Sequence, residues 1–250
     1  MQITTKTKHS MSKTKSLREE ANAATEVAEA SGEIIDGSPV TALAQTAPGA
    51  NLIQDLDESD FDFPRLTILQ GISRLAQEED FSAGDIVLDQ QYKLDKPIEF
   101  TVLRMGKLFE ENVDWDSGEI PRVLSKAAAV EAGGSFEWGH DGSKPDWMPV
   151  ADAFIAIRGE DPEIFPFEFG DGMNVAFALW RIKGVAYKRA AVKMFTAFRT
   201  YYRDGFSSGT FSLTTSTDKF NGKTVVVPQL KKGTANDEEF REWLATLITA

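Results

Sequence analysis

Apolar residues recur with a regular period only beyond about residue 60, and there the period is mostly that of strands. The preceding residues 1–58 are rich in Thr, Ser, Ala and Glu, and we expect a disordered arm because they cannot bury enough apolar surface to fold. Short apolar runs then predict strands at residues 63–69, 86–88, 98–105, 150–157, 165–169 and 174–182. Because strands outnumber helices and lie between Gly and Pro turns, residues 59–250 are expected to form one α+β domain, an OB-like small β-barrel with packed helices.

Three segments carry the period of a helix instead. Residues 123–132 predict a short helix that ends at Gly133-Gly134, and Val185–Tyr202 is the strongest helix of the chain. A last helix is expected after Thr234 or Asn236 as its capping residue, with apolar side chains at the i, i+3, i+4, i+7 positions Phe240, Trp243, Leu244 and Leu247. Before it, residues 211–215 and 223–227 predict a hairpin, because Asn221-Gly222 favours the left-handed turn that joins two strands.

Composition excludes several kinds of site. The chain has no cysteine and only two histidines, so disulfides, thiolate nucleophiles and cysteine-ligated metals cannot occur. Asp114 and Asp116 lack a third ligand at a recognisable spacing, and we therefore predict no metal, no cofactor and no catalytic residue. The longest apolar stretch, Val175–Trp180, is far shorter than the roughly 20 residues of a membrane-spanning helix, so no membrane partner is expected.

The charge is unevenly distributed along the chain. The whole chain carries a net charge of −12, but residues 181–232 contain eleven Lys and Arg against two acidic residues. Such a basic stretch in an acidic protein creates a local positive field, which is the usual electrostatic footprint of a polyanion site. The alternative is a fold with separate positively and negatively charged solvent-exposed faces and no polyanion ligand. Acidic loops of residues 61–180 would then neutralise the basic side chains.

On an ideal helix over residues 185–202, basic and apolar residues take opposite faces. The basic face holds Lys188, Arg189, Lys193, Arg199 and Arg203, with no acidic residue at i±3 or i±4 to pair with them. The other face holds Tyr187, Ala191, Met194, Phe195, Phe198 and Tyr202, and we expect it to pack on the core. Phosphates would neutralise the repulsion along the basic face and release condensed counterions.

Aromatic residues interleaved with the basic ones indicate which polyanion fits. Single strands are held by a basic groove with exposed rings on which bases stack, whereas duplex readers aim Asn, Gln or Arg at base edges. We therefore expect sequence-tolerant binding of single-stranded DNA, with Tyr201, Phe206 and Phe220 as candidate stacking rings. The predicted phosphate contacts are Arg181, Lys183, Lys188, Arg189, Lys193, Arg199, Arg203 and, on the hairpin, Lys219 and Lys223.

Three stretches resemble the single-stranded-DNA-binding proteins of tailed bacteriophages and related mobile elements. They are residues 63–71 (FPRLTILQG), residues 187–191 (YKRAA), and the block from residues 211–215 (FSLTT) to residues 226–228 (VVP). The resemblance implies an OB-like barrel, a role in replication or recombination in the cytoplasm of a bacterial host, and replication or recombination proteins as further partners. An oligomer is compatible with it. Such proteins often end in a disordered acidic tail, whereas this chain ends in an amphipathic helix.

Two other functions stay open on the sequence alone. A phage structural or assembly protein would use the basic stretch to bind an acidic partner subunit. A magnesium-dependent nuclease would instead use the acidic loops to hold the metal ion.

Overall fold

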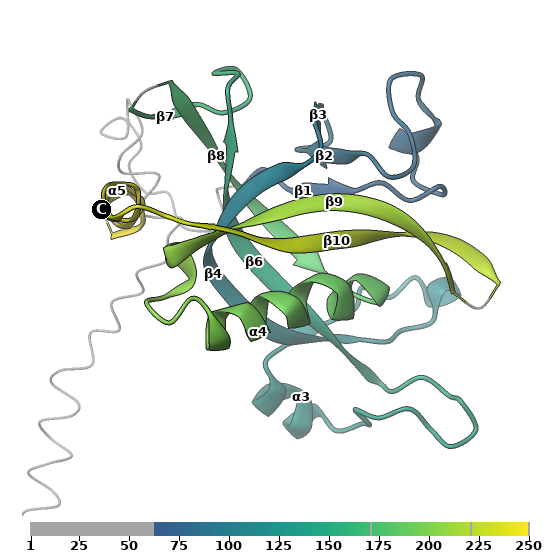
Figure 1. Cartoon of the computed structure of the whole chain (residues 1–250). Coiled ribbons are helices and arrows are strands. Elements are labelled where there is room, and N and C mark those ends of the chain that lie inside the picture. Colours follow the sequence, from purple (N-terminus) through teal and green to yellow (C-terminus); the bar gives the residue numbers. More distant parts are fainter. Residues whose placement is uncertain (1–62, 171, 221, 250) are drawn as a thin grey trace, which may run out of the picture.

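The computed structural model describes residues 63–170, 172–220 and 222–249 and has an α+β fold with two antiparallel sheets (Figure 1). The smaller sheet has the order β1-β2-β3, formed by Leu66–Ile68, Ile86–Leu88 and Tyr92–Leu94. The larger, seven-stranded sheet has the order β10-β9-β4-β6-β8-β7, with β5 also paired to β4. Its strands are β4 (Ile98–Glu111), β5 (Val123–Leu124), β6 (Trp147–Gly159), β7 (Phe167–Phe169), β8 (Met173–Ile182), β9 (Gly209–Phe220) and β10 (Lys223–Ala235). The predicted α+β class is confirmed, and the predicted disordered arm, residues 1–58, lies outside the described residues.

The helices are few and follow the predicted segments. They are α3 (Lys126–Ala132), the π-helix η5 (Tyr187–Ala191) with its continuation α4 (Val192–Thr200), and α5 (Glu238–Thr249), besides the 3-10 turns η3 (Leu75–Gln77), η4 (Trp115–Ser117) and η6 (Phe206–Ser208). Ser125 caps α3 by accepting a hydrogen bond from Ala128 N, and Gly133 ends it as predicted. Within the described part of the chain, none of these helices is long and apolar enough to cross a membrane.

The larger sheet separates two apolar clusters, which is why its central strands are buried on both faces. Ala153, Ile155 and Ile157 of β6 face the main cluster. Phe154 and Ala156, which alternate with them, face a second cluster that α5 completes with its buried Phe240 and Leu244. Both faces of β6 are therefore apolar at residues 153–157, which read as a continuous apolar run in the sequence.

The larger sheet does not close into a barrel within the described residues. β1 lies across the gap between its strands β8 and β10, where Leu179 N–H donates to Pro64 O at 2.9 Å. On the β10 side, the Gln70 side chain donates to Val226 O and accepts from Val226 N–H, both at 3.0 Å. β1 forms its ladder with β2, and Pro228 offers no N–H to extend a ladder along β10. The predicted barrel closure is therefore not found.

The predicted hairpin is present, and its strands are longer than expected. The ladder of β9 and β10 runs to the pair Phe220 and Lys223, so the connection is only residues 221–222, and Gly222 has the positive φ of +75° that such a turn needs. β4 pairs only with residues 210–213 of β9. The half of the hairpin nearest its tip therefore extends past Ile98, the first residue of β4 (Figure 1).

β4 is also longer than predicted. It continues beyond Met105, so Glu110 and Glu111, which were expected in an acidic loop, are strand residues paired with β6 and β5. One face of this part of the strand is open to solvent and therefore accepts charged residues. Their charge made the segment look like a loop in the sequence.

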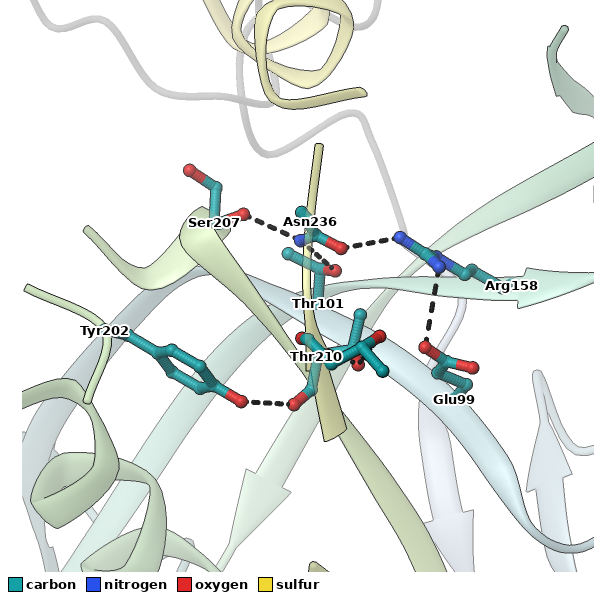
Figure 2. A network of polar contacts seen from close by, with 8 residues as sticks. Glu99, Thr101, Arg158, Tyr202, Ser207, Thr210 and Asn236 are labelled. Atoms are coloured by element: carbon teal, nitrogen blue, oxygen red, sulfur yellow. Dashed lines mark hydrogen bonds and ion pairs between the residues drawn. The ribbon is translucent and has the colours of Figure 1, made fainter. Parts of the chain in front are cut away.

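A network of polar contacts ties the start of α5 to the strands (Figure 2). The buried Asn236 side chain donates to Thr101 Oγ1 at 2.9 Å and to Ser207 O at 2.7 Å, and it accepts from Arg158 Nη2 at 2.6 Å. The predicted cap, Asn236 or Thr234, is wrong. The next residue, Asp237, caps α5 instead by accepting from the N–H of residue 240 at 2.7 Å, since Asp is as good a capping residue as Asn.

Candidate nucleic-acid interface

The predicted basic helix exists, with two changes to its geometry. Its buried residues are Ala190, Ala191, Met194 and Ala197. Ala191 and Met194 belong to the predicted apolar face, whereas Ala190 and Ala197 do not. Its first turn, however, is the π-helix η5, which holds more residues than an α turn and rotates the following side chains away from their ideal positions. The helix ends at Thr200, so Arg203 is not on the basic face, and this part of the prediction is wrong.

The helix lies beside the β9–β10 hairpin and follows the direction of β10 (Figure 1). At its start, Arg189 Nη2 is 2.5 Å from Asp218 Oδ2 on β9. In its middle, Lys193 Nζ is 3.5 Å from Leu230 O on β10. Past its end, Tyr201 lies under the ammonium of Lys232, 4.8 Å from the ring centre. Basic residues that are far apart in the sequence are therefore neighbours in the fold.

We call this region the helix–hairpin surface. It comprises Lys188, Arg189, Lys193 and Arg199 on the helix, Tyr201 directly after it, and Lys219, Phe220, Lys223 and Lys232 on the hairpin. The side chains of the helix divide into two sets. Arg189 and Lys193 contact the hairpin, whereas Lys188 and Arg199 have no ion pair with any described residue.

A cleft of about 560 Å³ opens where β1 fails to close the larger sheet. Its apolar lining includes Leu179, Val226 and Pro228, and its charged lining includes Arg181 and Lys183, two of the predicted phosphate contacts. Residues 185–186, which lead into the helix, and residues 225–228 of β10 border it as well. The cleft therefore adjoins the start of the helix–hairpin surface.

Three of the predicted cations pair with carboxylates. Arg181 donates two hydrogen bonds to Asp152, at 2.7 and 2.6 Å, and this contact raises the pKa of Arg181 above its usual value. Lys183 lies 2.8 Å from Glu110, and Arg189 pairs with Asp218 as described above. Each cation is about half exposed, and ion pairs at such positions contribute only about 0–1 kcal/mol to stability. A phosphate can therefore replace the carboxylate at little energetic cost.

The other predicted phosphate contacts are open. Arg203, Lys219 and Lys223, like Lys188 and Arg199, are exposed and form no ion pair with any residue that the structure describes. Arg203 lies in the turn after the helix, while Lys219 and Lys223 lie near the tip of the hairpin. The predicted cations thus form one group around the cleft and hairpin tip and a second, smaller group at the far end of the helix.

Two of the three predicted stacking rings are exposed. Tyr201 is 65% exposed and Phe220 is 52% exposed. Phe206 is half-buried and stacks on Phe198, with ring centres 4.1 Å apart and an interplanar angle of 20°. Phe198 was assigned to the core face, but it is 37% exposed. Its neighbour Ala197 is buried instead, because the π turn of η5 shifts the following side chains from the ideal projection.

The acidic side chains do not assemble a metal site in the described residues, where no group of three or more His, Asp or Glu is arranged to hold an ion. Glu111, for example, is occupied by Arg122, which donates to both of its carboxylate oxygens and lowers its pKa.

We compared the chain with protein-family models, curated proteins and solved structures, and none of them matches it. The resemblance to phage single-stranded-DNA-binding proteins therefore stays a prediction.

Proposed function

We propose that this protein binds single-stranded DNA without sequence preference, along the cleft and the helix–hairpin surface. The observation that carries the proposal is the series of contacts that join helix to hairpin at Asp218, Leu230 and Lys232. These contacts bring together two segments, residues 188–201 and 219–232, that carry nine basic or aromatic side chains between them. Such a combination of cations and exposed rings is what single strands require.

The geometry supports separate roles for the cations, which would contact phosphates, and for the aromatic rings, which would stack on bases. The η5–α4 helix of fourteen residues is about 21 Å long, so its cations can follow several nucleotides of an extended strand. Tyr201 and Phe220 offer exposed rings at opposite ends of this path. Because stacking contributes about 1–3 kcal/mol per base and accepts any base, such a site is sequence-tolerant.

The fold is compatible with an OB-like barrel left open at the cleft. OB-folds are themselves partly open five-stranded barrels, and here β1 lies across the gap between β8 and β10 of the larger sheet. In this proposal residues 59–250 act as a single nucleic-acid-binding domain. Its place of action would be replication or recombination of a phage or mobile element, in the cytoplasm of the bacterial host.

The test is a titration of fluorescein-labelled oligo-dT with the full chain at several salt concentrations. We expect the logarithm of the affinity to fall linearly with the logarithm of the salt concentration. The variant Lys188→Gln/Arg199→Gln should bind more weakly to every sequence, and its slope should be smaller by about 1.4, because each phosphate contact of a single strand contributes about 0.7.

The matched control is Lys126→Gln/Lys144→Gln, which removes the same charge from exposed residues outside the helix–hairpin surface. It should leave the slope unchanged. Absence of binding at low salt, affinity that does not respond to salt, or equal losses in the two variants would each overturn the proposal.

A further inference from the structure

The tip of the β9–β10 hairpin combines an exposed ring with two lysines. Its last two ladder pairs are Lys219 with Thr224 and Phe220 with Lys223. Directly opposed residues share a face of a hairpin, and consecutive residues take opposite faces. Lys223 therefore lies on the same face as the ring of Phe220, and Lys219 lies on the other face. Phe220 makes no ring contact with any described residue.

The hairpin is braced immediately behind this tip. Asp218 is paired with Arg189 of the helix, and Gln70 holds Val226 by two hydrogen bonds. Further back, Thr215 Oγ1 donates to Gly84 O at 2.7 Å. The connection has only two residues, so Phe220 and Lys223 form the last ladder pair beyond these contacts.

We propose that this tip opens the end of a DNA duplex at its junction with a single strand. Phe220 stacks on the terminal base pair and enters the stack, as apolar wedges do in other DNA complexes. Lys219 and Lys223, on opposite faces of the hairpin, contact the phosphates of the two separated strands. Ring–base stacking is comparable in strength to a base-pair step, so the ring can replace the stacking that one opened pair loses.

This activity rests on the proposed function, because the single strand that adjoins the duplex must occupy the helix–hairpin surface. The proposal assigns Phe220 a role that differs from that of Tyr201: Tyr201 holds bases of a strand that is already single, whereas Phe220 acts on paired bases. The two roles separate in an experiment that measures occupancy and base opening independently.

The experiment uses a stem-loop DNA with an oligo-dT tail and 2-aminopurine either in the terminal base pair of the stem or in its middle. Occupancy is followed by anisotropy of a label on the tail, and opening by 2-aminopurine fluorescence. We expect the full chain to raise the fluorescence of the terminal probe and not that of the middle probe. At equal occupancy, Phe220→Ala should reduce the rise at least about fivefold, the equivalent of the weakest base–ring stack.

Tyr201→Ala is the matched control, since it removes an exposed ring at the other end of the surface. It should weaken tail binding yet keep the full fluorescence rise once occupancy is restored. An unchanged rise in Phe220→Ala, or no rise with the unmodified chain bound to the tail, would overturn the tip's role and leave the proposed function standing. Failure to occupy the tail at all would overturn both.

Discussion

At the scale of single residues, Asn236 shows how one buried amide can hold three parts of the chain together (Figure 2). Its partners Thr101, Arg158 and Ser207 belong to β4, β6 and η6. Asn236→Ala leaves all three without their partner, and we expect the free energy of unfolding to fall by about 2–4 kcal/mol. Urea denaturation measures this loss. Asn112→Ala, the same change at an exposed site, should alter stability by less than about 0.5 kcal/mol; similar losses for the two variants would contradict the role of the network.

The sequence could show which residues are charged or aromatic, but not what they contact. Arg181 and Lys183 were expected to contact phosphates, and they are exposed, yet their partners Asp152 and Glu110 come from distant strands that pair only in the folded sheet. For the same reason Asn236 was interpreted as a helix cap. Local pattern favours that role equally well, and only the neighbouring strands decide against it.

At the scale of elements, the β2–β3 hairpin depends on the nearly buried carboxylate of Asp85. Burial raises the pKa of Asp85, but the hydrogen bonds from Lys93 and from Ser82 N–H, with the charge of Lys96, outweigh it and lower the pKa below its usual 3.8. A lowered folded-state pKa contributes stability above the unfolded-state pKa, and this contribution is lost as the pH falls through the folded-state value.

The unmodified chain should therefore lose stability below about pH 4 more steeply than Asp85→Asn. The difference between their unfolding free energies, measured at pH 7, should disappear as the pH falls. Chemical denaturation from pH 7 to pH 2 measures both curves. Asp80→Asn, at an exposed site, should keep the acid slope of the unmodified chain. A gap that stays constant with pH would show that Asp85 acts by packing and not by its charge.

Element types were predictable where one physical rule dominated, as for the Asn-Gly hairpin and the amphipathic α5. Prediction failed where tertiary contacts decide. β4 continues through Glu110 and Glu111 because β6 and β5 provide ladder partners. The π turn of η5 shifts the phase of the basic helix. Arg203 lies off the predicted face because the helix ends at Thr200.

At the scale of the whole molecule, the separation of charge along the sequence is partly undone by folding. The carboxylates of Asp152, Glu110 and Asp218 each form an ion pair with one of the basic residues. The chain's net charge of −12 already repels DNA. If the helix–hairpin surface and its adjoining cleft bind phosphates, these three carboxylates compete with them. Their removal should then strengthen binding, the opposite of what most substitutions at a binding site do.

We therefore expect Asp152→Asn/Glu110→Gln/Asp218→Asn to bind oligo-dT about tenfold more tightly at low salt, because three weak ion pairs no longer have to be displaced. The salt dependence should also steepen, since each freed cation then adds its full share of counterion release. The control Glu238→Gln/Glu239→Gln/Glu242→Gln brings the net charge to the same value from α5, on exposed residues outside the surface. It should gain much less affinity, because charges beyond one Debye length, about 8 Å at physiological salt, are largely screened. Equal gains in both variants would mean that only the net charge matters and that the three pairs lie outside the path of the DNA.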